Sequence, residues 1–291
     1  MTGLQHAPVV AGVDGSPHSW AAAELAAGEA VRRHRPLRLV HGYAPPAAYS
    51  TGTLVAFEAA APARELRAVL RERADRLWGR YPGLTVTTAV TDGYPAAVLI
   101  DESLTASLVV VGSRGLGGIR GMLAGSVGAQ VAAHAFAPVI VVHADPGAGS
   151  GTGVVVGVDG SAGATAALEF AFEAADGFGN RLTAIYAWPA RRRHADGPPD
   201  VEGQADADRY LAEQLAGWSE KYPDVTVERR AVPTHNPLQT LVSHSRDAGL
   251  VVVGPRGRGG FAGLLLGSVS DGLVRHAHRP VAVVHARLEV S

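Results

Sequence analysis

The sequence predicts an α/β protein of two tandem doubly wound domains, each with a five-stranded parallel sheet (order 3-2-1-4-5) and helices on both faces. Two observations carry this prediction. Several segments recur in the same order in the second half of the chain, and short apolar runs alternate with amphipathic stretches in each copy. The chain of 291 residues is also about twice the usual length of a domain, and its hydrophobic content of 47% is sufficient for two cores.

The internal repeat spans the whole chain. The matched pairs of segments are 10–16 and 155–161, 81–86 and 222–227, 108–115 and 250–257, and 138–143 and 280–285. Because all the matches occur in the same order, they indicate a duplicated domain. We expect one domain over residues 1–146 and a second over 152–291. The Gly/Ser-rich stretch Asp145–Gly153 is the expected linker between them.

The elements of the first copy follow from the length and composition of its apolar runs. Short β-branched runs are typical of buried parallel strands and are too short for helices. They cover residues 8–13, 37–42, 84–90, 107–112 and 138–143. Amphipathic stretches between the runs predict helices over Trp20–Arg33, Ala63–Tyr81, Pro95–Ser103 and Ser126–Ala135. Ser16 followed by Pro17 is typical of an N-cap and first turn, so this pair opens the first helix.

The second copy repeats this plan. Its strands are predicted over residues 154–158, 182–187, 225–231, 250–254 and 280–285. Alternating β and α units with continuous apolar strands imply a parallel sheet that is covered by helices on both faces. The crossover connections are expected to be right-handed.

An acidic residue and a glycine-rich loop occur in both copies where a ligand site is expected. Open α/β sheets bind ligands beyond the carboxyl ends of the strands, where the strand order reverses. Asp14 and Asp159 end the first strand of each copy, and the glycine-rich loops 112–126 and 254–268 follow the fourth strand. Strands 1 and 4 flank the switch point in the order 3-2-1-4-5. The acid and the loop are therefore expected to face one crevice.

The composition of the loop favours an anion. Glycines let the backbone approach a ligand closely, and successive N–H groups then converge on it. The final Gly-Ser opens the next helix, whose amides attract phosphate, and Ser126 or Ser268 is expected to supply both a hydroxyl and the helix cap. The loops contain arginines and no acidic residue: Arg114 and Arg120 in one, Arg256 and Arg258 in the other. Two alternatives remain open, a simple tight turn for the glycines and a helix cap for the two acids.

Composition excludes several classes of protein. The chain has no cysteine, which rules out disulfides and thiolate chemistry. A formal net charge of −1 and the absence of a basic stripe argue against a nucleic-acid partner. The beginning of the sequence has no apolar signal region, and no apolar run is long enough to span a bilayer. We therefore expect a cytoplasmic protein without a membrane partner.

Other binding motifs fit poorly. A Walker loop requires a lysine after its second glycine, and Lys221 is the only lysine in the chain. The spacing of Gly257, Gly259 and Ala262 imitates a dinucleotide fingerprint, but it follows strand 4 rather than strand 1. The sequence contains no nucleophile elbow of the hydrolase type. We expect no metal site, because His276 and His278 are better explained as a solvated helix end.

With these residues identified, the sequence resembles the universal stress protein family in its tandem-domain form. ATP-binding members of that family share the motif Gly-x2-Gly-x9-Gly-(Ser/Thr). The motif occurs here as Gly112-x2-Gly115-x9-Gly125-Ser126 and as Gly254-x2-Gly257-x9-Gly267-Ser268. The Val-Asp-Gly-Ser opening matches in both copies too, at residues 13–16 and 158–161. The resemblance therefore covers nearly the whole chain.

The resemblance implies one ATP, or a related adenine nucleotide, in each lobe, with or without Mg²⁺. The acid after strand 1 would contact the adenosine, and the backbone at the end of strand 2 would meet the adenine. The residues expected to bind nucleotide in the first copy are Gly12, Asp14, Gly42, Gly112, Arg114, Gly115, Gly117, Gly118, Gly125, Ser126 and Val127. Those expected in the second copy are Gly157, Asp159, Ala187, Gly254, Arg256, Gly257, Gly259, Gly260, Gly267, Ser268 and Val269.

The same resemblance implies a role in the stress response and pairing of domains through strand 5. The runs Val139–Val142 and Val281–Val284 would then meet across a pseudo-two-fold axis, and we expect whole chains to form a homodimer. Two departures from the repeat bear on the site. Pro255 replaces Ser113 and removes a backbone donor, so the second lobe is expected to hold phosphate slightly differently. Tyr186 stands where the first copy has His41, so unequal adenine pockets are expected.

Three functional readings are compatible with these residues: a nucleotide-binding regulatory protein, an ATPase or phosphotransferase, and a structural pseudo-dimer with empty pockets. Phosphoryl transfer needs metal ligands and a group that positions the nucleophile. Each loop lacks acidic residues, and only Asp14 or Asp159 is within reach of its loop. We therefore expect a binding or signalling module without catalytic residues, and slow ATP hydrolysis is the alternative. Retention of the loop in both copies disfavours the purely structural reading.

Overall fold

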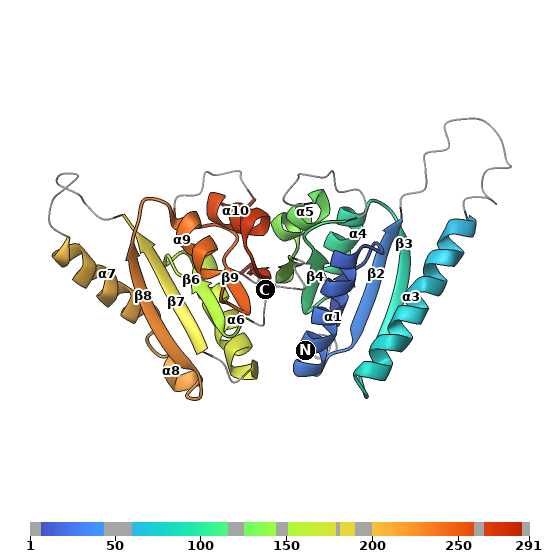
Figure 1. Cartoon of the computed structure of the whole chain (residues 1–291), viewed down its shortest axis with the longest axis horizontal. Helices are drawn as coiled ribbons and strands as arrows, with labels where there is room; N and C mark the ends of the chain where they lie inside the picture. Colours follow the sequence, from blue (N-terminus) through green and yellow to red (C-terminus); the bar gives the residue numbers. More distant parts are fainter. Residues whose placement is uncertain are drawn as a thin grey trace, which may run out of the picture. The chain divides into compact units, whose positions relative to one another are not determined.

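The computed structural model describes residues 7–43, 60–115, 125–143, 151–178, 181–189, 200–258 and 265–286. The chain divides into two compact units, Met1–Ala144 and Asp145–Ser291, hereafter the first and the second unit. Both units have the predicted α/β architecture (Figure 1).

The first unit contains a parallel sheet in the strand order β3-β2-β1-β4-β5. All four neighbouring strand pairs of this sheet are parallel. Its elements are β1 (Val9–Gly12), α1 (Pro17–Arg32), β2 (Leu37–Tyr43), α3 (Ala60–Arg80), β3 (Val86–Asp92), α4 (Pro95–Glu102), β4 (Leu108–Gly112), α5 (Ser126–His134) and β5 (Val139–Val142). This is the predicted 3-2-1-4-5 order, with strand bounds within two residues of the prediction.

The second unit has the same topology, in the strand order β8-β7-β6-β9-β10. Its neighbouring strands are also parallel. Its elements are β6 (Val154–Gly157), α6 (Ala162–Phe178), β7 (Arg181–Trp188), α7 (Val201–Gln214), α8 (Trp218–Lys221), β8 (Thr226–Pro233), α9 (Pro237–His244), β9 (Leu250–Val253), α10 (Ser268–His276) and β10 (Val281–Val283). In the sequence repeat, α3 of the first unit thus corresponds to α7 and α8 here, and α8 begins directly after its N-cap Gly217, which has φ of 82°.

Helices cover both faces of the sheet, as the register of two glycines shows. Gly12 pairs with Val111, so the side-chain positions of Gly12 and Gly112 point to opposite faces. A β-carbon at Gly12 would meet Leu99 of α4, whereas a β-carbon at Gly112 would meet His18 of α1. On the face of the sheet that α4 covers, α4 also packs against α5 (Figure 1). The core therefore lies on both sides of the apolar strands β1 and β4.

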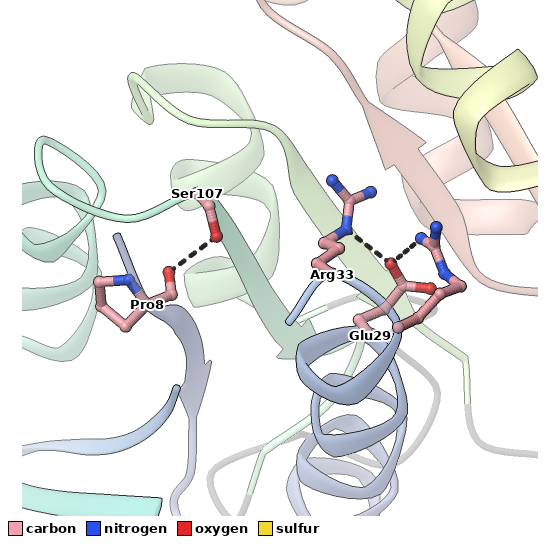
Figure 2. Close-up of polar contacts among 5 residues, drawn as sticks. Pro8, Glu29, Arg33 and Ser107 are labelled. Atoms are coloured by element: carbon pink, nitrogen blue, oxygen red, sulfur yellow. Dashed lines mark hydrogen bonds and ion pairs between the residues drawn. The ribbon is translucent and has the colours of Figure 1, made fainter. Parts of the chain in front are cut away.

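The start of the sheet and the far end of α1 are fixed by polar contacts (Figure 2). The hydroxyl of Ser107 donates to the carbonyl of Pro8 at 3.1 Å, which ties the beginning of β4 to that of β1. Glu29 on α1 is only 4% exposed. Its carboxylate accepts from Nε of Arg33 at 2.9 Å and also pairs with Arg32. These two arginines, at the last residue and the C-cap of α1, supply the partners that a buried carboxylate needs.

The predicted opening of α1 is confirmed in detail. Ser16 is the N-cap, and its side chain accepts a hydrogen bond from the N–H of Ser19 at 3.2 Å. Pro17 occupies the first helical position, where its missing N–H costs nothing. The helix begins three residues before the predicted Trp20, because the periodicity of apolar residues starts later than the cap. Among the described residues, no helix is long and apolar enough to cross a membrane.

Candidate functional site

The acid after the first strand shapes the turn into the first helix in both units. The N–H of Ser16 donates to Oδ1 of Asp14 at 2.9 Å, and the N–H of Ser161 donates to Oδ1 of Asp159 at 3.0 Å. The intervening glycines have positive φ, 92° at Gly15 and 71° at Gly160, a region that glycine adopts without strain. Since Ser16 is the N-cap of α1, Asp14 precedes the cap and does not replace it.

The acid and the glycine loop meet in both units, as the strand order predicted. A β-carbon on Gly115 would overlap Oδ2 of Asp14, and one on Gly257 would overlap Oδ2 of Asp159. In the second unit the N–H of Arg258 also donates to Oδ2 of Asp159 at 2.9 Å. The carboxylate therefore fills the space that a side chain at the second motif glycine would need.

The two ends of the glycine loop also meet. The N–H of Gly125 donates to the carbonyl of Ser113, and a β-carbon on Gly125 would lie 3.8 Å from the amide nitrogen of Gly115. The hydroxyl of Ser16 lies 3.4 Å from the carbonyl of Arg114, which joins this loop to the start of α1. The second unit repeats these contacts: Gly267 N to Pro255 O at 2.8 Å, and Ser161 Oγ to Arg256 O at 3.2 Å. Acid, loop ends and helix starts thus form one cluster in each unit.

The predicted ligand contacts Gly117, Gly118, Gly259 and Gly260, and the loop arginine Arg120, lie outside the described residues.

The expectation that Ser126 and Ser268 cap the following helices is wrong. The N-caps of α5 and α10 are Gly125 and Gly267, each with extended backbone and without a side-chain cap bond. The two serines occupy the first helical position and are exposed. The sequence was misleading because serine usually takes the cap position. Amides of the first helical turn lack partners within the helix, so a glycine cap leaves them without a capping side chain.

Pro255 does lack a backbone donor, but the expectation that this donor belongs to the phosphate site is wrong. In the first unit the N–H of Ser113 donates to the carbonyl of Val142 in β5, at 2.8 Å. The donor that Pro255 lacks is therefore a donor of the sheet, not of the loop interior. Its carbonyl still accepts from Gly267, as that of Ser113 accepts from Gly125. The substitution thus removes no amide that could reach an anion.

Several predicted pocket glycines have a packing role in the structure. A β-carbon on Gly12 would lie 2.6 Å from Cδ1 of Leu99, and one on Gly42 would lie 2.6 Å from Cα of Pro95. Both glycines let α4 approach the sheet. In the second unit, a β-carbon on Gly157 would lie 3.2 Å from Cδ1 of Leu241 in α9. Ala187 is half-buried near the end of β7. Contact of these residues with a ligand stays a prediction.

His18 belongs to the cluster of the first unit, and sequence reasoning missed it. It is the second helical residue of α1, half-buried beside Gly112. Burial and the positive charge of Arg114 lower the pKa of His18, and the carboxylate of Asp14 opposes them. The imidazole therefore stays neutral at pH 7. Its counterpart in the repeat is Gly163, so the comparison of the two copies gave no signal for it.

Arg258, Tyr210 and Tyr186 form a cluster in the second unit that the sequence did not predict. The guanidinium of Arg258 lies 4.9 Å from the ring centroid of Tyr210 and donates to its hydroxyl. The ring centroids of Tyr210 and Tyr186 are 4.8 Å apart. Burial raises the pKa of Tyr210, so its hydroxyl stays protonated at neutral pH. The sequence drew attention to Arg258 and Tyr186 separately but not to Tyr210, because α7 lies outside the matched segments.

Over the ranges that the structure describes, no group of three or more His, Cys, Asp or Glu side chains is placed to hold a metal ion. His276 and His278 are both exposed near the end of α10.

Comparisons with known proteins agree with this architecture. The model of the universal stress protein family matches residues 6–143 and again residues 152–285. A universal stress protein of Mycolicibacterium smegmatis is 39% identical over 287 residues, covering 96% of this chain and 97% of that protein. One of Mycobacterium tuberculosis is 36% identical over 303 residues, covering 96% and 97%.

A solved structure shows the same fold. The crystal structure of a universal stress protein from Archaeoglobus fulgidus superposes with a TM-score of 0.65 at 19% identity, over 96% of both chains. The two α/β units of this chain agree with the two matched stretches of the family model. The chain belongs to the universal stress protein family, with two family domains in tandem.

Proposed function

We propose that each unit binds an adenine nucleotide, and that the chain acts as a binding or signalling module of the stress response. One observation carries this proposal: in both units the acid after the first strand contacts the motif glycine of the loop, beside the start of a helix. Asp14 and Asp159 would contact the adenosine, and the loop with the helix start would hold the phosphates.

The start of α5 suits a phosphate group. The helix has a glycine cap without a side-chain bond and no acidic residue in its first turn. Its N-terminal amides and its dipole favour a negative charge. Arg114 is exposed at the other end of the loop and contributes positive charge. A phosphate chain would therefore meet donors from Ser126 and Val127 on one side and a guanidinium on the other.

The start of α10 differs in charge. Asp271 lies in its first turn, but both of its oxygens accept from the guanidinium of Arg275, at 2.9 and 3.0 Å. This pair lowers the repulsion that Asp271 would exert on a phosphate, although the pair is exposed and therefore weak. The second unit is proposed to bind the same class of ligand at a less favourable helix start.

The direct test is to look for bound nucleotide and then to remove the acid. Purified protein is denatured, the supernatant is analysed by mass spectrometry, and binding of ATP, ADP and AMP is measured by calorimetry. In the Asp14→Ala, Asp159→Ala double variant, affinity is expected to fall by about 1.5–3 kcal/mol, because each carboxylate would accept a ligand hydrogen bond while charged.

The exposed Asp75 of α3 offers a control of the same charge change. Asp75→Ala is expected to bind nucleotide as the unchanged protein does. If the double variant kept full affinity, or if no adenine nucleotide bound to the unchanged protein, the proposal would be wrong.

We propose binding rather than efficient catalysis. Rapid phosphoryl transfer requires groups that hold a metal ion and position the nucleophile. In the described part of each unit, the carboxylate that contacts the loop, Asp14 or Asp159, already accepts the N–H of the serine two residues later. Phosphate release from ATP is therefore expected to stay below roughly 1 s⁻¹, the lower end of common turnover numbers, with or without Mg²⁺. A faster rate that Asp14→Ala and Asp159→Ala abolish would favour an ATPase instead.

A further inference from the structure

We propose that Arg258 and Tyr210 close the adenosine side of the second unit, so that the first unit is the tighter nucleotide site and the second binds only when this pair opens. The inference rests on the proposed function and adds to it an inequality between the two sites.

The closing pair lies directly on the turn that carries the acid. Tyr210 comes from α7, and Arg258 comes from the glycine loop after β9. A β-carbon on Gly160 would overlap the hydroxyl of Tyr210 and would lie 2.5 Å from Nη2 of Arg258. Gly160 immediately follows Asp159, so both side chains occupy the space next to this carboxylate.

The groups that would receive a nucleoside are already paired with one another. Asp159 accepts the N–H of Ser161 on one oxygen and that of Arg258 on the other. The Arg258 guanidinium lies over the ring of Tyr210 and donates to its hydroxyl, which combines a cation–π contact with a hydrogen bond. The ring of Tyr210 also contacts Tyr186. A ligand at Asp159 would have to replace these contacts with its own.

The stack extends to the expected position of the adenine. Tyr186 precedes Ala187 in β7, the residue whose backbone is expected to meet the base. The three side chains thus run from the acid to the end of the second strand of this unit. They cover both parts of the site that would bind adenosine, while the helix start at Gly267 lies on the phosphate side.

The first unit has different residues at the corresponding places in its sequence. Tyr210 stands twelve residues before Tyr222, and Val69 stands twelve residues before the matching Tyr81. Val69 is 45% exposed. The counterpart of Arg258 in the loop repeat is Leu116, which lies outside the described residues but has no charge to offer. An Arg–Tyr pair cannot form from valine and leucine.

Closure lowers the apparent affinity of the second site in proportion to the fraction of molecules that are open. If roughly one molecule in ten is open, the apparent dissociation constant rises about tenfold. Nucleotide would then fill the first unit at low concentration and the second unit only at higher concentration. The protein would respond to nucleotide in two steps.

Calorimetry on full-length variants separates the two sites. Asp159→Ala weakens the site of the second unit, so binding to this variant reports on the first unit. Asp14→Ala reports on the second unit in the same way. ATP is expected to bind the first unit at least five times more tightly than the second. Adding Tyr210→Val to Asp14→Ala should tighten binding to the second unit roughly fivefold or more. Adenosine is titrated in parallel, because its binding does not depend on the phosphate side.

A second pair of variants removes single contacts. Tyr210→Phe keeps the ring and removes the hydroxyl that accepts from Arg258, so a smaller gain in affinity is expected. Arg258→Leu introduces the residue of the first unit, and here adenosine is the more informative ligand because a positive charge is lost. Tyr222→Phe alters a tyrosine that packs against Phe172, away from the site, and should change nothing. Circular dichroism identifies any variant that fails to fold.

The outcomes are distinct. Equal affinities of the two units for ATP would overturn closure. Weaker binding by the second unit after Tyr210→Val and Tyr210→Phe would also overturn it, because the tyrosine would then be a ligand contact. If the first unit bound ATP but Tyr210→Val left the affinity of the second unit unchanged, closure would be overturned and the proposed function would stand. Absence of ATP and adenosine binding from every variant, as well as from the unchanged protein, would overturn the proposed function together with the inference.

Discussion

Gly125→Val is expected to weaken nucleotide binding by the first unit roughly 10- to 100-fold, which corresponds to about 1.4–2.8 kcal/mol. Gly125 caps α5 with φ of −75° and ψ of 153°, a backbone conformation that valine also adopts. A β-carbon there would lie at ordinary contact distances of 3.4 Å from Ser113 O and 3.8 Å from Gly115 N. The added bulk therefore sits between the two ends of the loop, where the phosphates are proposed to bind.

The measurement is calorimetry with ATP in an Asp159→Ala background, so that only the first unit reports. Gly125→Ala carries the β-carbon alone and should give a smaller loss. Gly79→Val places the same bulk on α3, at an exposed position where a β-carbon would have no neighbour within 4 Å, and should leave affinity unchanged. Full affinity in a folded Gly125→Val protein would rule out phosphate binding between the loop ends.

Gly112→Ala is expected to destabilise the first unit by about 1–3 kcal/mol, the usual cost of overpacking. A β-carbon on Gly112 would lie 2.9 Å from the carbonyl carbon of His18 and 3.1 Å from its Cβ. These are atoms of the first turn of α1, so no side-chain rotation can relieve the overlap. The end of β4 and the start of α1 would have to separate, and Asp14 and Ser16 would move with the helix.

Urea unfolding followed by circular dichroism measures the change. Gly254→Ala provides the twin in the second unit, where the β-carbon would lie 2.8 Å from the carbonyl carbon of Gly163. The control is Gly28→Ala in α1, where an added β-carbon would meet no atom within 4 Å outside the adjacent backbone of the helix. That variant is expected to gain roughly 0.5–1 kcal/mol, because alanine is the better helix former. Stabilities equal to that of the unchanged protein for Gly112→Ala and Gly254→Ala would contradict the close approach of the helix.

The repeated pattern of the chain predicted the strand order and the meeting of acid and loop. Apolar runs such as 108–112 are continuously buried and too short for a helix, which identifies them as strands. Once β1 and β4 are neighbours, the residues at their carboxyl ends must lie close together. The contact of Asp14 with Gly115 follows from topology alone.

Details that depend on single hydrogen bonds were not predictable in this way. Whether glycine or serine takes the N-cap of α5 is decided by the path of the loop, and the composition Gly-Ser permits both. The target of the Ser113 amide was likewise hidden, since only the structure shows that it pairs with Val142. A sequence pattern gives the number of donors but not their directions.

Residues outside the repeat carried no signal either. His18 and Tyr210 enter the two sites from helices, at positions where the other copy has an unrelated residue. Comparison of the copies emphasises what they share, so it cannot detect what makes them different. The Arg258–Tyr210 pair joins segments separated by 48 positions, and only the tertiary structure brings them together.

Gly115 cannot be enlarged while Asp14 keeps its place, because Oδ2 of the aspartate fills the volume that a β-carbon on the glycine would need. Enlarging the glycine forces the aspartate to be lost or displaced, so a single mutation would damage two recognition elements at once. Descendants of this chain in which the glycine has been enlarged should therefore also have lost the acid, whereas those that keep the acid should keep the glycine. The same constraint applies separately to Gly257 and Asp159, so the two halves of the chain can change at these positions one at a time.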